Sequence, residues 1–572
     1  MTAVRRLIII FVSLMTVATL FAQEPATQRT DTTTQATTAR TVEAVTADTD
    51  QDVNDPRALR LSLDEAIRTS IQRNLGVQLQ AFEYQEAGQS LRGSYGIYDA
   101  LATALLQEQN VQRAVTSTID ASATRSVTFN VGVQQNLPTG GGYSVGVDNS
   151  RTTTSSLFST VNPSYEPGLN FALNQPLLRD FGIDVNRRGI TIARNTLGIN
   201  HELFRTQLMN TAVDVEQAYL NLAYARRAVD VVKDSLFLAR DQARITQIRI
   251  DVGAAAPLEI LEPRVTIATT EESLIIATAN VRTAEDTLRQ LLNLDPAEWD
   301  RPIIPTDPVE YRPLEIDVND AVRRALELRP ELRQDALTTD TRRVNYLYSR
   351  NQTLPQLDFD LRYGLAGLAG TAEQIDPETG EGTGRFERIP YGRGLTNILE
   401  ADFPTWTIGF NVGVPITNIG ARAEAKRAEL DFRQSRLQQE QTRQTIMIDV
   451  RGAARAVDTA ARSIVATRAA REAAERNVEA ERRRYENGMT TNFQVLRVQQ
   501  DLSDARIREL NALVGYNQAV ARYHRAVGDV LDIRGISVDP PELAQEPRIF
   551  STLDRYNWLN YGSRVKLEDE LK

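Results

Sequence analysis

The sequence of 572 residues contains no cysteine and only two histidines. Without cysteine the chain cannot form a disulfide, a thiolate metal site or a cysteine nucleophile, and it has no cysteine to carry an N-terminal lipid. His201 and His524 stand far apart, which argues against a zinc site and a histidine-based catalytic triad. The net charge of −10 argues against nucleic-acid binding. We therefore predict no catalytic residue, no metal ligand and no cofactor.

Long hydrophobic runs are also missing. The apolar stretch at residues 7–21 follows Arg5 and Arg6 and is shorter than the roughly 20 residues of a spanning helix. This order of basic and apolar residues is typical of a secretory signal, which we place at residues 1–22. Residues 23–58 are rich in threonine and poor in large apolar side chains, so we expect a disordered leader. Any membrane spanning must then be done by strands.

The chain repeats its own pattern. Residues 61–78 align with residues 316–333, and Val252-Gly253 aligns with Asn487-Gly488 further along. Each half then has the order short helix, longer helix, strands, proline, very long helix, glycine turn, long helix. The predicted divisions are repeat 1 at 59–294, a linker at 295–315, repeat 2 at 316–529 and a C-terminal tail at 530–572.

Long stretches of both halves carry a seven-residue hydrophobic repeat. In the first half a large side chain stands at every seventh position, and a mostly small one follows three positions after it. Small side chains let neighbouring helices approach closely. The long helix pairs are expected at 186–294 and 420–529, and a helix from 186 to 251 would be about 95 Å long. Helices alone leave an isolated two-stranded coiled coil open. The large residues of the two repeats are Leu208, Val215, Leu222, Val229, Leu236, Ala243 and Ile250, then Val450, Val457, Ile464, Val478 and Tyr485, with Arg471 as an interruption.

Period-two alternation of apolar and polar residues predicts strands within about 101–176 and 355–416. A soluble sandwich gives the same pattern, but the export signal and the strand lengths favour transmembrane strands. We expect polar loops at 150–165 and 370–402. In the strand at 357–363, the polar residues that alternate with the apolar ones should face the lumen of a barrel. These residues are Asp358, Asp360 and Arg362. The alternating segments are 127–133, 143–147, 169–173, 357–363 and 406–414.

The number of strands requires more than one chain. A barrel needs at least about eight strands to close, and one chain offers about four to six. An open edge in lipid is forbidden because its unpaired amides cost several kcal/mol each. The chain must therefore oligomerise, and a trimer would close the barrel. We favour six strands because residues 101–176 contain an extra hairpin pattern, with a soluble flap as the alternative.

The sequence resembles the outer membrane efflux protein family, the TolC-type channels. The resemblance covers residues 59–530 and is carried by an ordered set of short motifs. It implies a mixed α and β membrane protein, in which a homotrimer forms an outer-membrane β-barrel continued by a periplasmic α-helical coiled-coil barrel. It also implies an equatorial layer at 295–330 and 530–550. The motifs are Leu63-Asp64-Glu65-Ala66, Arg329-Pro330-Glu331-Leu332, Gln175-Pro176-Leu177-Leu178 and the segment 485–528, with strand-to-helix junctions at Pro176 and Pro415.

The resemblance implies a passive exit duct of a tripartite efflux or type I secretion system, in the outer membrane of a Gram-negative-type bacterium. The implied partners are outer membrane lipid, a periplasmic adaptor (membrane fusion) protein and an inner-membrane RND, ABC or MFS pump. The two glycine turns would be tips that contact the adaptor. A helix that ends in a left-handed residue explains the glycines equally well. The predicted tip residues are Val252, Gly253, Ala254, Asn487, Gly488 and Met489.

The family closes its periplasmic end with carboxylates and polar links between helices. Glu259 stands at a family acidic position, and Glu262 lies one turn later on the same side of the helix. Arg497, where the family often has an acid, is our candidate counter-charge. An ordinary solvated helix face is the alternative. The complete predicted aperture set is Glu259, Glu262, Tyr485, Gln494 and Arg497.

Other functions fit the sequence less well. A trimeric coiled-coil surface stalk or adhesin without transport is the main alternative, but it predicts one terminal barrel rather than strands in both halves. A general porin lacks helices of such length. Residues 142–146 fit a serine-hydrolase elbow, yet they lie inside an alternating strand rather than at a strand-to-helix turn. The chain is therefore not expected to be an enzyme.

Overall fold

The computed structural model describes residues 55–115, 121–156, 159–375, 382–536 and 540. The predicted signal peptide, almost all of the predicted leader and the tail beyond 536, except residue 540, lie outside them. The described residues from Arg57 onward belong to one compact unit. None of the described helices is long and apolar enough to cross a membrane.

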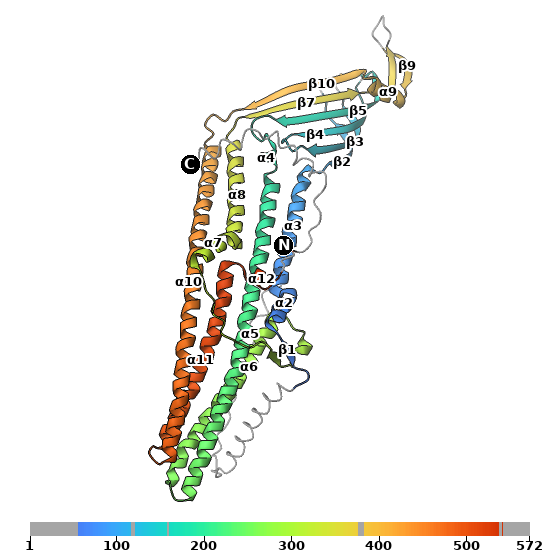
Figure 1. The fold of residues 1–572 in the computed structure, drawn as a ribbon. Coiled ribbons are helices and arrows are strands. Elements are labelled where there is room, and N and C mark those ends of the chain that lie inside the picture. Colours follow the sequence, from blue (N-terminus) through green and yellow to red (C-terminus); the bar gives the residue numbers. More distant parts are fainter. Residues whose placement is uncertain (1–54, 116–120, 157–158, 376–381, 537–539, 541–572) are drawn as a thin grey trace, which may run out of the picture. The chain divides into compact units, whose positions relative to one another are not determined.

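The helices follow the same order in both halves of the chain. The first half has α2 (Leu63–Arg73), α3 (Leu75–Ser94), the 64-residue α5 (Arg188–Asp251) and α6 (Leu261–Leu292). The second half has α7 (Val318–Leu328), α8 (Pro330–Asn351), the 68-residue α10 (Ile419–Glu486) and α11 (Asn492–Val527). Figure 1 shows the long helices side by side. The short helices are η1 (Tyr95–Tyr98), α4 (Ile183–Asn186), η2 (Pro257–Ile260), η3 (Pro296–Glu298) and α12 (Val530–Ile533).

The motifs that open each repeat are helix starts. The Ser62 side chain accepts a hydrogen bond from the backbone N–H of Glu65, and the Asp317 side chain accepts from two backbone amides at the start of α7. These bonds satisfy amides that have no partner in the first turn of a helix. In the second helix of each pair, Asn74 caps α3 and Pro330 occupies the first position of α8, where a missing N–H costs nothing.

The predicted seven-residue seam forms the core between the long helices. Of its large residues in α5, Leu208, Val215, Leu222, Val229 and Leu236 are at most 4% exposed. One apolar cluster joins α5 and α6 to α2, and a second joins α10 and α11 to α7. Arg471 interrupts the seam in α10, and its guanidinium pairs with Glu509 at 2.5 Å and Glu475 at 2.8 Å. The interruption is therefore an ion-pair network between α10 and α11.

The long strands form a single antiparallel path. Its order is β10-β7-β5-β4-β3-β2, so strands of both halves meet where β5 pairs with β7. The path has six strands, the number that the sequence favoured, and within the described chain β2 and β10 leave an edge unpaired. The strands are β2 (Leu101–Gln112), β3 (Ala123–Asn136), β4 (Gly142–Thr154), β5 (Val161–Pro176), β7 (Gln356–Ala366) and β10 (Phe403–Gly413).

The prediction of two polar loops, at 150–165 and 370–402, was wrong in large part. The ladder between β3 and β4 continues to the pair Thr124–Thr154, because threonine suits an extended strand although it is polar. The second region contains a short hairpin, β8 (Ala369–Ile375) with β9 (Gly382–Ile389), and a helix, α9 (Tyr391–Glu400). The hairpin joins the sheet through β5.

The sheet has one apolar and one polar face. Across three strands Ile408 pairs with Leu361, which pairs in turn with Leu173, and Ile408 is 55% exposed in the single chain. On the other face Asn174 Nδ2 donates to Asp360 Oδ1 at 2.9 Å, and Gln356 Nε2 donates to Asp358 Oδ2 at 2.6 Å. The predicted polar residues of β7 therefore share the face opposite the apolar rows.

Two tyrosine hydroxyls hold the linker between the halves, one near its middle and one near its end. Tyr219 of α5 donates to the Leu61 carbonyl at 3.0 Å and accepts from the Asp307 amide at 3.1 Å. Tyr516 of α11 donates to the Arg312 carbonyl at 2.7 Å and accepts from the Leu314 amide at 3.1 Å. Burial raises the pKa of both phenols. The linker thus crosses from the helix pair of one repeat to that of the other.

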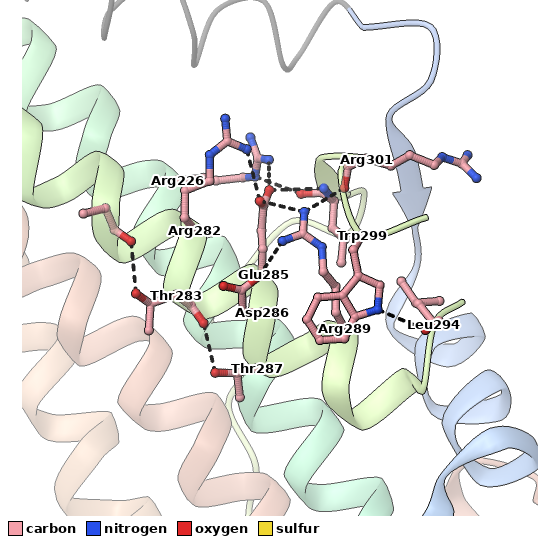
Figure 2. Close-up of polar contacts among 12 residues, drawn as sticks. Arg226, Arg282, Thr283, Glu285, Asp286, Thr287, Arg289, Leu294, Trp299 and Arg301 are labelled. Carbon is pink, nitrogen blue, oxygen red and sulfur yellow. Dashed lines mark hydrogen bonds and ion pairs between the residues drawn. The ribbon is translucent and has the colours of Figure 1, made fainter. Parts of the chain in front are cut away.

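A buried carboxylate anchors the start of this linker. Glu285 of α6 is 0% exposed and accepts hydrogen bonds from Arg226 at 2.6 Å, Arg289 at 3.2 Å and the Ile303 amide at 3.1 Å (Figure 2). Ile303 belongs to β6 (Ile303–Pro305), which pairs in parallel with β1 (Leu59–Leu61). Arg289 also donates to the Arg301 carbonyl at 2.8 Å. One side chain thereby ties α5, α6 and the linker together.

Candidate functional site

The two turns between the long helices have the same hydrogen-bonded form. After α5, the amides of Gly253 and Ala254 donate to the carbonyls of Ile250 and Arg249, and the Gly253 φ angle is +75°. After α10, Gly488 and Met489 repeat this pattern, and the Gly488 φ angle is +71°. These paired bonds close a helix end on a left-handed residue, which glycine adopts without a steric cost. The glycines therefore have a structural reason to stand where they do.

All of the predicted tip residues are exposed at these turns. Val252 is 72% and Met489 is 69% exposed, so both apolar side chains lie largely in solvent in the single chain. Gly253, Ala254, Asn487 and Gly488 complete the two exposed turns. The turns thus present apolar side chains on firmly closed helix ends.

A buried polar cluster joins the two tips. Gln242 Nε2 and Thr246 Oγ1 of α5 donate to Asn492 Oδ1 of α11 at 2.7 and 3.3 Å. These three residues are at most 3% exposed. Asn492 Nδ2 in turn donates to the Glu259 carbonyl at 3.4 Å. Because buried polar groups lose water, their mutual bonds fix the position of one tip against the other.

Arg249 makes the second link, between α5 and α10. Its Nη1 donates to the Tyr485 carbonyl at 3.1 Å, and its guanidinium carbon lies 4.5 Å from the centroid of the Tyr485 ring. A cation over an aromatic face is stabilised by the ring quadrupole. Tyr485 is 3% exposed, and its hydroxyl has no hydrogen-bond partner within the described part of the chain. The predicted aperture residue Tyr485 is therefore a link inside one chain.

Among the described residues, the predicted carboxylates form no ion pair with the predicted counter-charge. Glu259 is exposed on η2, where Oε1 accepts from the Ala256 amide at 3.2 Å, and Glu262 is exposed at the start of α6. Arg497 is exposed on α11 and Gln494 is half-buried. The ion pairs around the tips, among the residues that the structure describes, connect other side chains such as Arg482 with Asp241 at 3.4 Å. Within the described part of one chain, Glu259 and Glu262 are therefore exposed and form no ion pair with Arg497.

Sequence reasoning missed the polar cluster and the Arg249 link. Thr246 stands on the small-residue track of the α5 seam, which offers a weak signal for a core position. Gln242 and Asn492 are 250 residues apart in the sequence, so their meeting depends on the register of α5 against α11.

The two prolines flank the change from strand to helix. Pro176 is the last residue of β5, and the following amide, from Leu177, donates to the Leu357 carbonyl at 2.7 Å. Pro415 lies between β10 and α10. Proline ends a hydrogen-bonded ladder because it has no N–H to donate. No group of three or more potential metal ligands occurs in the described segments.

The fold consists of two helix hairpins with closed tips and a shared sheet. Comparisons with known proteins find the same fold in one family. A model of the outer membrane efflux protein family matches residues 142–294 and 321–529, more than half of the sequence. The chain belongs to the outer membrane efflux protein family. It is a TolC-type channel of the outer membrane that extends into the periplasm, and it is not an enzyme. The family fold implies a trimer that works with an efflux system, so the stalk alternative is set aside.

Individual relatives support this placement at low sequence identity. The channel is 22% identical over 341 residues to outer membrane efflux protein BepC of Brucella suis, covering 59% of the channel and 67% of BepC. It is 32% identical over 97 residues to toxin and drug export protein A of Aggregatibacter actinomycetemcomitans, covering 17% of the channel and 21% of that protein.

Solved structures share the fold. The CmeC outer membrane channel of Campylobacter jejuni superposes with a TM-score of 0.59 at 14% identity, covering 87% of this chain and 89% of CmeC. The MtrE channel of Neisseria gonorrhoeae gives a TM-score of 0.54 at 14% identity, covering 82% of this chain and 89% of MtrE.

Proposed function

We propose that this channel is the passive exit duct of a tripartite efflux or type I secretion system, closed into a barrel by three copies of the chain. The observation that carries the proposal is the sheet, in which β2 and β10 each leave an edge that no other described residue pairs with. An unpaired edge in lipid costs several kcal/mol per amide, and pairing β10 of one copy with β2 of the next removes both edges. Three six-stranded copies supply 18 strands, and barrels of this size leave an aqueous channel.

The two faces of the sheet match this arrangement. The exposed apolar rows, such as Ile408 and Phe410, would contact outer membrane lipid, and the polar face with Asp360 and Arg362 would line the water-filled lumen. Below the barrel, the helices would form the periplasmic duct. Cargo would enter it from an inner-membrane RND, ABC or MFS pump through a periplasmic adaptor protein.

The exposed tips are the proposed contact with the adaptor. Val252 and Met489 present apolar side chains at the end of the helices, where a partner would bury them. The rigid turns hold these side chains in place, so the turn glycines support the contact indirectly.

Changing both turn glycines tests the adaptor contact. We expect Gly253→Val with Gly488→Val to weaken adaptor binding by about tenfold or more, because a side chain at positive φ costs roughly 1–2 kcal/mol per residue and distorts the turn. Binding of the purified adaptor to immobilised channel measures the effect. Gly452→Ala, in the interior of α10, is the matched control and should bind as the parent does. Parental affinity in the double variant would rule out the tips as the contact.

The exposed carboxylates near the tips are the proposed aperture. Three copies of Glu259 and Glu262 would form rings of negative charge, which attract cations and repel one another. Arg497 would be their counter-charge across a chain boundary, since it does not meet them within one chain. Gln494 would line the same constriction.

Ion selectivity tests the rings. We expect Glu259→Gln with Glu262→Gln to lose most of its preference for cations over anions, because the fixed charge at the narrowest point disappears. Reversal potentials in planar bilayers under a potassium chloride gradient report this preference. Glu272→Gln, which removes an exposed carboxylate farther along α6, should keep it. A double variant with the parental reversal potential would show that these residues are an ordinary helix face.

A further inference from the structure

The helix α9 lies outside the pattern of the two repeats, and it packs against the sheet backbone to backbone. A Cβ atom on Gly367 would lie 2.0 Å from the Gly394 carbonyl oxygen, and one on Gly394 would lie 3.1 Å from the Pro167 ring. A side chain at position 367 would therefore clash with the α9 backbone, and one at position 394 would be tight against Pro167. Asn397 is also buried, and its Nδ2 donates to Asp402 Oδ2 at 2.6 Å just beyond the helix. The helix is therefore held firmly on the sheet.

The alternation of side chains identifies the face that α9 covers. Pro167 is two residues from Leu169, and Gly367 is two residues from Leu365, so both lie on the apolar side of the sheet. Tyr165 has the same parity, and its ring meets the ring of Tyr391 at the start of α9, with centroids 6.3 Å apart. β5 runs from this end toward Pro176 and α5. The helix thus lies on the apolar face, at the end away from the long helices.

The outer surface of α9 carries an apolar stripe, with the exposed Arg393 and Glu400 beside it. Leu395 and Leu399 lie one turn apart and are 45% and 87% exposed. They point away from the buried side of the helix, which carries Gly394 and Asn397. An exposed pair of leucines on a well-anchored helix is unfavourable in water.

We propose that α9 is an interfacial helix that inserts Leu395 and Leu399 into the outer leaflet of the outer membrane. The pair continues the apolar face, which we have placed against lipid. From Leu357 to Leu365 the strand covers about 20 Å of membrane normal, for a rise of ~3.3 Å per residue and a tilt of ~40°. Barrels carry an apolar band of about 25 Å. Because α9 packs on Gly367 and Pro167, just beyond Leu365, its leucines continue the band past the end of β7.

Aromatic residues around α9 support this depth. Trp406 of β10 pairs directly with Tyr363 of β7 on the apolar face, and both are exposed. Tyr391 at the start of α9 is 42% exposed. Tryptophan and tyrosine gather where a barrel leaves the hydrocarbon, because the rings are apolar and carry a polar group. These aromatic residues lie at the α9 end of the apolar face, the end at which the hydrocarbon would give way to water.

Because the chain contains no cysteine, a label attached to one introduced cysteine reports on that position alone. Single substitutions Leu399→Cys, Phe410→Cys and Met489→Cys carry an environment-sensitive fluorophore in the full-length trimer, reconstituted in vesicles of phosphatidylethanolamine and phosphatidylglycerol. Quenching by nitroxide lipids measures contact with the bilayer, and quenching by iodide measures contact with water. We expect lipid quenching at 399 to exceed that at 489 several-fold, with a shallow nitroxide more effective than a deep one. Position 410, on the apolar face of β10, should also be quenched by nitroxide lipids.

Each other result overturns the inference. If the label at 399 responds to iodide as the label at 489 does, α9 lies in water. If it is shielded from both quenchers and cross-links between chains, a second copy covers it. The inference rests on the proposed lipid contact of the sheet, and position 410 separates the two. Loss of lipid quenching at 410 as well removes the lipid contact itself, whereas loss at 399 alone removes only the role of α9.

Discussion

Replacing Glu285 with alanine is expected to lower the free energy of unfolding by about 3–5 kcal/mol, the range for breaking a buried ion pair from one side. The carboxylate is fully buried and is the shared acceptor for Arg226, Arg289 and the Ile303 amide. Its removal leaves the guanidinium of Arg289, which is 5% exposed, without its buried counter-charge, so that only the exposed Asp286 at 2.7 Å remains. The loss also frees the start of the linker from α6.

Denaturant unfolding of the detergent-solubilised trimer, followed by circular dichroism, measures the change. Glu298→Ala is the matched control, because its pair with Arg301 lies close by but both side chains are over a third exposed. A surface pair of this kind contributes less than about 1 kcal/mol. Equal shifts of the midpoint in the two variants would contradict the anchoring role of Glu285.

Removing both links between the tips is expected to open the channel. Arg249→Ala with Asn492→Ala deletes the bonds from α5 to α10 and to α11. If each link contributes about 1 kcal/mol to the closed arrangement, the closed–open equilibrium shifts by roughly 30-fold. Single-channel recordings in planar bilayers should then show a conductance well above that of the parent.

The control for this experiment is another pair between the same elements. Arg482 and Asp241 meet at 3.4 Å, with 47% and 23% of their side chains exposed, so Arg482→Ala should change the conductance little. Native mass spectrometry establishes that each variant remains a trimer. Parental conductance in an intact double variant would mean that the two links have no part in closing the duct.

The helices and the repeat were predictable because their signals are local. The large residues at every seventh position of α5 define a buried face whatever the helix packs against, and they became its core. The capping residues Ser62 and Asp317 mark helix starts through bonds that span only three residues. The alternation in β7 and β10 likewise defined the two faces of the sheet before any pairing was known.

The links at the tips and the helix on the sheet could not be predicted in this way. The bond between Gln242 and Asn492 depends on how far α5 slides along α11, and many registers bury the same seam. In the region predicted as a loop, polarity concealed short elements that tertiary contacts stabilise. Gly394 in α9 is an example. Its backbone contacts Gly367, and no local sequence pattern indicates that contact.

The strand order also determines how late in folding the β-sheet can be completed. Leu169 pairs with Leu365, so β5 has to wait for β7, which follows the whole first helix hairpin in the chain. Such distant pairing is slow, because a long loop must close before any contact forms. Until then the hairpins β2–β3 and β4–β5 expose an apolar face and an unpaired edge during export. We therefore expect assembly to depend on periplasmic chaperones that shield nascent strands.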